Sequence, residues 1–185
     1  MKLKSIMPLF LVALLGACAT GSTVAEKRAT IQKMRADTLT KLYKLEPGAR
    51  SRIKTAAGYG VFSNIGVNII FLSAGGGWGV VHDNKTGKNT YMNMGSAGIG
   101  LGLGIKDFRG VFVFTRRKNM DWFINRGWDA SAQADAAAKA GSKGDAWAGA
   151  VDIAPGIRLY QLTESGLALQ ATIQGTKFWK DSKLN

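Results

Sequence analysis

No charged side chain occurs between Thr55 and Val81, a stretch of 27 residues that constrains the fold more than any other feature. An apolar helix of that length would cross a bilayer core of roughly 30 Å. However, Asn64 interrupts the stretch, and the glycines at 75–79 are poor helix formers. A glycine-rich run bounded by turn residues instead predicts two buried strands, at about 59–72 and 76–83.

Further along, glycines alternate with aliphatic residues from Gly98 to Ile105. A dinucleotide-binding loop needs Gly-x-Gly-x-x-Gly between a strand and a helix, whereas here the spacing is strictly two. Side chains alternate between the faces of a strand, so this pattern predicts a strand with one aliphatic face and one almost bare face. The bare face would serve close packing, or a groove in which an acyl chain lies against the backbone. Both interpretations stay open.

The N-terminus has the layout of a secretory signal peptide. Two lysines precede the apolar run Ile6–Leu15, which is too short to span a bilayer. The residues Leu15-Gly16-Ala17-Cys18 resemble the lipobox of bacterial lipoproteins. The resemblance implies removal of residues 1–17, diacylation of Cys18 with a further acyl chain such as palmitate, and a lipidated tether over 18–25. Ala19 in place of Asp implies the outer membrane, with the protein on its periplasmic or surface side.

Composition limits the chemistry and the partners. Cys18 is the only cysteine, so the chain forms no internal disulfide. The formal net charge is +13, and +11 once Lys2 and Lys4 are removed with the signal peptide. A surface of this charge favours anionic partners. Outside the cytoplasm these would be acidic lipid headgroups, and nucleic acid is not expected. Residues 26–185 are long enough for one domain with its own core.

Apolar residues at near-helical spacing predict a helix over Val24–Leu45. Three basic residues, Lys33, Lys41 and Lys44, lie together on one flank of its apolar stripe. A basic amphipathic helix near a lipidated N-terminus would lie on a membrane surface. The alternative is a helix that packs on a sheet with its lysines in solvent.

The remaining chain predicts short elements separated by turn residues. After Pro47 we expect a second short helix, Arg50–Ala57, and later a hairpin turn around Gly87. The connection "KDFRG" should precede a strand "VFVFT", and the helix "RRKNMDWFIN" should end at Gly127. Alanine content favours helix for 128–140, whereas alternation of small and polar residues favours a strand. A hairpin is predicted across Thr163–Gly166.

The residues needed for common catalytic sites are missing. His82 is the single histidine, beside Asp83 at a predicted turn, and no serine has a Gly-x-Ser-x-Gly setting. One histidine with dispersed carboxylates does not supply the three or four ligands of a zinc site. The sequence therefore predicts a protein that is not an enzyme and that holds neither a metal ion nor a cofactor.

Several motifs resemble the SYLF-domain family over about 42–181: "AAGYGVFSNIG", "GGGWGVV", "GSAGIGLGLGIKD", "FINRGW" and "YQLTESGLALQATIQGTKFW". The resemblance implies a single α+β domain with a curved, barrel-like antiparallel sheet, N-terminal helices and one further helix. It also implies a lipid-binding module that favours phosphoinositides, tilts 128–140 towards strand, and places a basic helix at the N-terminus. Ser63 and Val67 depart from the family's usual Pro and basic residue.

Two functions follow as alternatives. The first is a membrane-anchored lipoprotein that binds anionic, phosphoinositide-like headgroups through a basic face. The second is an envelope scaffold or stress-response protein with a protein partner, which would use Trp122, Phe123, Trp128 and Trp147 if these are exposed. The candidate lipid-binding residues of the first function are Lys33, Lys41, Lys44, Arg50, Arg52, Lys54, Arg116, Arg117 and Lys118.

Overall fold

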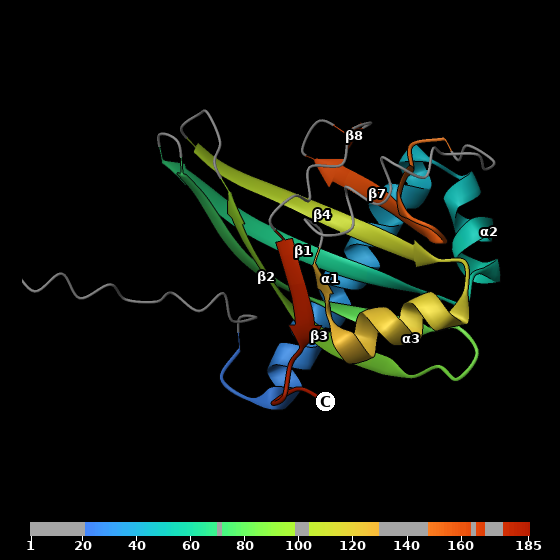
Figure 1. Cartoon of the computed structure of the whole chain (residues 1–185), viewed down its shortest axis with the longest axis horizontal. Coiled ribbons are helices and arrows are strands. Elements are labelled where there is room, and N and C mark those ends of the chain that lie inside the picture. Colours follow the sequence, from blue (N-terminus) through green and yellow to red (C-terminus); the bar gives the residue numbers. More distant parts are fainter. Residues whose placement is uncertain (1–20, 70–71, 99–103, 130–147, 164–165, 169–175) are drawn as a thin grey trace, which may run out of the picture.

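A computed structural model describes residues 21–69, 72–98, 104–129, 148–163, 166–168 and 176–185 (Figure 1). The fold is α+β, a curved antiparallel sheet with three helices packed against it, which confirms the predicted class. The helices are α1 (Val24–Leu45), α2 (Gly48–Thr55) and α3 (Arg117–Arg126). The strands are β1 (Gly58–Ile69), β2 (Leu72–Asp83), β3 (Asn89–Gly98), β4 (Gly104–Phe114), β5 (Trp128–Asp129), β6 (Val151–Ala154), β7 (Ile157–Thr163), β8 (Gly166–Ala168) and β9 (Thr176–Lys180).

The strand order is β5-β9-β3-β2-β1-β4-β7-β6, with β8 paired to β7. The first three strands form consecutive hairpins, and β4 pairs with the free side of β1 over Gly58–Phe114 to Asn68–Gly104. The long strands β1 to β4 curve together across the molecule (Figure 1). The predicted turn between β2 and β3 is present, with Gly87 at a φ of 72°.

The two faces of the sheet bury separate apolar clusters. Successive residues of a strand point to opposite faces, so β4 sends Val111 and Val113 to one side and Phe112 and Phe114 to the other. The first face is covered by α1 and α2. The second is covered by α3, whose Phe123 ring packs among the rings of Phe62, Phe112, Phe114, Trp128 and Phe178.

The helix α1 has the predicted bounds and packs on the sheet. Its apolar stripe, which includes Ile31 and Leu42, is buried against the strands. At its start, Thr23 and Glu26 form a capping box. The hydroxyl of Ser22, followed by the Thr23 and Ser22 backbone N–H groups, lowers the pKa of Glu26 to about 2. Of the two interpretations of this helix, the structure therefore supports packing on a sheet.

Glycines in β2 make room for large side chains. A Cβ atom at Gly79 would lie 2.3 Å from Val61 O and 2.4 Å from a ring carbon of Phe62. A Cβ atom at Gly77 would lie 2.1 Å from Ser63 O. Glycine at these two positions thus allows close contact between neighbouring strands on the α3 face.

Some predicted boundaries were wrong. The segment "KDFRG" is part of β4, which runs unbroken from Gly104 to Phe114. Arg109 in this segment donates to Thr38 Oγ1 of α1 at 3.3 Å, so a charged residue there has a helix partner. The second helix starts at Gly48, two residues earlier than expected. The centre of the glycine alternation, 99–103, and most of 128–140 lie outside the described residues, as do Cys18 and Trp147.

Candidate functional site: a basic end of the sheet

Segments that are far apart in the sequence meet at one end of the sheet. Asn84, in the β2–β3 turn, donates through its side chain to the carbonyl oxygens of Ile53 at 2.7 Å and Ala56 at 3.0 Å. The N–H of Ala57 donates to Phe114 O at 2.9 Å. The end of α2, the turn and the start of α3 therefore lie side by side, as Figure 1 also shows.

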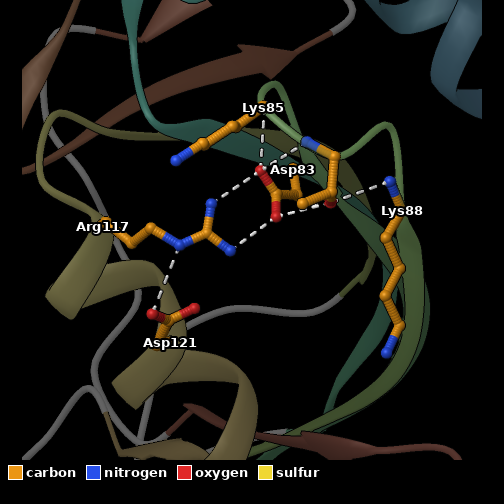
Figure 2. Close-up of polar contacts among 6 residues, drawn as sticks. Asp83, Lys85, Lys88, Arg117 and Asp121 are labelled. Atoms are coloured by element: carbon orange, nitrogen blue, oxygen red, sulfur yellow. Dashed lines mark hydrogen bonds and ion pairs between the residues drawn. The ribbon is translucent and has the colours of Figure 1, made fainter.

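An ion pair fastens the turn to α3. Asp83 Oδ1 accepts from Arg117 Nη1 at 3.0 Å, and Asp83 Oδ2 accepts from Arg117 Nη2 at 2.7 Å. Figure 2 shows this bidentate contact. The same carboxylate accepts from the backbone N–H of Lys85 at 2.9 Å and from the Thr86 hydroxyl at 2.7 Å. Arg117 Nε also lies 3.6 Å from Asp121 Oδ2. These contacts fix the turn in place.

The pair shifts the pKa of both partners. The hydrogen bonds from Arg117, assisted by those of Thr86 and Lys85, hold the pKa of Asp83 well below its usual range. Hydrogen bonding to Asp83 raises the pKa of Arg117. Both groups are therefore charged at neutral pH. The sequence predicts a lipid contact for Arg117 and a turn position for Asp83, but it does not predict their pairing, because the two residues are 34 positions apart.

Five exposed basic residues belong to the segments that meet at this ion pair. We call them the basic end face. Lys85 and Lys88 extend away from the pair in different directions in Figure 2. Within the part of the chain that the structure describes, the charged side-chain groups of these five form no hydrogen bond or ion pair. The basic end face consists of Lys54 from α2, Lys85 and Lys88 from the turn, and Arg116 and Lys118 from the start of α3.

The nearby carboxylates already have basic partners. Asp83 and Asp121 contact Arg117, and Glu46 lies 3.3 Å from Arg52 Nη1. These contacts leave the five cations of the end face without a neutralising side chain among the described residues. Like charges held together in this way attract anions from solution.

The remaining predicted residues are dispersed. Lys33 is paired with Asp37 at 2.6 Å, and Lys41 donates to Thr163 O at 2.7 Å. Lys44 is exposed near the end of α1, about 16 Å along the helix from Lys33. Arg50 stacks over the Tyr43 ring at 4.4 Å.

Arg52 is half-buried and donates to Tyr160 Oη at 3.3 Å. The structure thus brings Lys54, Arg116 and Lys118 together with two lysines that were not predicted. The three lysines of α1 lie along one helix over about 16 Å, and two of them have protein partners.

A cleft of about 410 Å³ adjoins the end face. It lies between the β2–β3 turn, α3 and the C-terminal segment, with Lys88 and Arg117 on one side and Arg28 and Lys180 on another. Arg28 Nε donates to Leu184 O at 2.9 Å, and Lys180 Nζ donates to Asn125 Oδ1 at 2.8 Å. The volume falls in the range of small-molecule sites.

A second cleft of about 410 Å³ lies beyond the other end of α3. We call it the aromatic groove. Trp122 of α3 and Trp179 of β9 are exposed there by 38% and 47%. Three of the aromatic residues proposed for a protein interface are among the described residues: Phe123 and Trp128 are buried in the core, and Trp122 is exposed. Trp179 was missed. The groove is lined by Trp122, Arg126, Gly127, Trp128, Phe178 and Trp179, with Asp129 and Lys177 beside them.

Other candidate chemistry has structural explanations. His82 lies at the end of β2, where its ring packs 5.3 Å from that of Tyr59 and its Nδ1 donates to Asn89 Oδ1 at 2.8 Å. Among the described residues, no three His, Cys, Asp or Glu side chains are grouped to hold a metal ion. A search of the same residues finds no helix with the length and hydropathy to span a membrane.

Fold and site together define a single-domain α+β protein with one basic end and one aromatic groove. The chain is 33% identical over 162 residues to "Beta cell expansion factor A" of Aeromonas veronii. The alignment covers 88% of this chain, which spans about 60% of the length of that relative. No family model matches the chain.

Proposed function

We propose that this protein is a non-enzymatic, membrane-anchored lipoprotein that binds anionic lipid headgroups through its basic end face. The observation that carries the proposal is the gathering of Lys54, Lys85, Lys88, Arg116 and Lys118 from three separate segments. Their positions relative to one another are held by the Asp83–Arg117 pair and the Asn84 bonds. A fixed array of exposed cations suits a surface that carries many negative groups.

The adjoining cleft supports recognition of a headgroup. Arg28, Lys88 and Lys180 line a space of about 410 Å³, which has room for a phosphorylated polar group. The charge-assisted bonds that such cations make to phosphate are stronger than neutral ones. The resemblance to the SYLF-domain family agrees with a lipid ligand.

The anchor and its location form the second part of the proposal. The lipobox-like residues before Cys18 support an acyl anchor, and Ala19 supports the outer membrane. Mass spectrometry of the N-terminal peptide tests the anchor directly. A mass shift of the acyl groups on Cys18 is expected, and an unmodified cysteine would contradict it.

The headgroup test uses the chain from residue 18 with Cys18→Ser, so that no acyl chain contributes. We expect it to float with anionic vesicles and not with neutral ones, and to dissociate as salt screens the charges. Each basic residue near an anionic surface contributes about 1 kcal/mol, so changing all five end-face residues to Gln should weaken binding by roughly 4,000-fold.

Two control variants separate this face from other basic residues. Lys27→Gln with Lys183→Gln removes charge outside the end face and should change binding little. Lys33→Gln, Lys41→Gln and Lys44→Gln tests the lysines of α1, and we expect a smaller loss because two of them already have protein partners. Losses in proportion to the number of charges removed in all three variants would mean that only net charge matters. Absence of binding to any vesicle would end the headgroup proposal and favour a protein partner.

A further inference from the structure

The aromatic groove has an exposed surface that core packing does not explain. Trp122 and Trp179 are exposed by 38% and 47%, whereas Trp128 between them in the sequence is 2% exposed. The floor of the groove includes Gly127, where a Cβ atom would lie 2.5 Å from Phe178 O. Its φ of 73° also favours glycine, so backbone and rings meet closely there.

Two cations belong to this aromatic surface. Arg126 and Lys177 line the groove and are exposed. The carboxylate that lines it, Asp129, is paired with Lys177 at 3.3 Å. Tryptophan with lysine and arginine is the combination that proteins place at the boundary between lipid headgroups and acyl chains, since the indole is apolar with one polar N–H.

The groove is continuous with the basic end face along α3. Lys118, Trp122 and Arg126 are spaced four residues apart and follow one exposed stripe of this helix. The opposite side of the helix buries Met120 and Phe123 in the core. A flat surface that contacts Lys118 at one end of α3 can therefore also contact Trp122 and Arg126.

The C-terminal segment connects the groove to the start of α1. The chain passes from Trp179 to Leu184, whose carbonyl accepts from Arg28 in the second turn of α1. Thr23, which caps α1, is five residues after Cys18, a reach of at most about 18 Å. An acyl anchor at Cys18 would hold this side of the molecule close to the bilayer.

We propose that the aromatic groove is a membrane-docking site, in which Trp122 and Trp179 enter the interfacial layer of a bilayer while Lys118 and Arg126 contact its headgroups. The proposal rests on the proposed function for the identity of the surface. It adds an apolar contact to a headgroup contact and assigns α3 and β9 to the membrane side. A protein partner and a second copy of the chain are the competing occupants.

The test uses lipidated protein extracted from membranes and reconstituted into neutral phosphatidylcholine vesicles with brominated acyl chains. Bromine quenches only tryptophans that approach the chains, and the anchor keeps the protein on the vesicle without headgroup binding. We expect clear quenching in the wild type and loss of more than half of it in Trp122→Phe with Trp179→Phe. The matched control Trp78→Phe changes a half-buried tryptophan that packs on the α1 face and should keep the wild-type quenching.

Three results would overturn the groove proposal. The first is equal quenching in the wild type and the double variant when thermal unfolding shows both to be folded. The second is no quenching in the wild type. The third is a dimer in sedimentation that dissociates in the double variant, because the groove would then be occupied by a second copy. Quenching as expected, together with unchanged anionic binding of the five-glutamine variant, would instead refute the headgroup proposal alone.

Discussion

Replacement of Asp83 by asparagine should loosen the end of the sheet that carries the basic residues. The carbonyl oxygen of asparagine can still accept hydrogen bonds from the Lys85 N–H and from Arg117 Nη1. Its amide NH2 would face Arg117 Nη2 and the Thr86 hydroxyl, which both donate to Asp83 Oδ2 at 2.7 Å. Two short bonds to a side chain only 9% exposed are lost. Hydrogen bonds to charged groups contribute about 1.5–3 kcal/mol each. Because Arg117 is 44% exposed and water replaces part of the loss, we expect about 2 kcal/mol in total.

The stabilisation by Asp83 should depend on pH in one direction. The folded-state pKa of Asp83 is depressed, so the stabilisation is complete above the unfolded pKa of about 4 and is lost as pH falls through the lower folded value. Chemical unfolding from pH 7 to pH 2 should show the stability gap between wild type and Asp83→Asn shrink below about pH 4. At neutral pH the melting temperature should fall by roughly 4–8 °C. A gap below about 0.5 kcal/mol at pH 7, or one that is constant down to pH 2, would refute the reasoning.

Two further predictions concern the core that supports the site. Phe123→Ala removes a fully buried ring that meets five other aromatic rings and should destabilise the protein by about 3–5 kcal/mol in urea unfolding, whereas Phe123→Leu, which refills most of the cavity, should lose less than half as much. Equal losses would mean that the ring contacts, and not the buried volume, account for the stabilisation. Gly79→Ala places a methyl group 2.3 Å from Val61 O and should lower the free energy of unfolding by more than about 2 kcal/mol. Its control is Gly87→Asn, at an open turn position with positive φ, which should change the free energy of unfolding by less than about 1 kcal/mol in the same assay.

Local patterns in the sequence predicted the elements that depend on neighbouring residues. The apolar spacing of α1 and the glycine after α3 gave the right bounds because both signals act within a few residues. The sequence predicts a connection at the charged segment "KDFRG". It is part of a strand, and Arg109 within it bonds to Thr38, 71 residues away.

The basic end face could be predicted only in part, because it also depends on contacts between segments that are far apart in the sequence. Lys54, Arg116 and Lys118 were selected from runs of charge. Lys85 and Lys88 join them because β2 and β3 form a hairpin whose turn meets the end of α2, a contact between residues about 30 positions apart. The same pairing of distant segments engages Arg117 with Asp83 and brings Trp122 and Trp179 into the lining of one cleft.

The position of α1 has a consequence for how the chain folds. This helix is synthesised first among the described elements, yet the surface that buries its apolar stripe includes Tyr91, Tyr160 and Leu184. Those partners extend to the C-terminal end of the chain, so the burial of Ile31 and Leu42 is completed only when the last residues are available. Contacts of such long range are slow to form. Under the lipoprotein function proposed above, export would depend on protection of this helix from aggregation until the C-terminal segment arrives, and folding should be completed only after translocation ends.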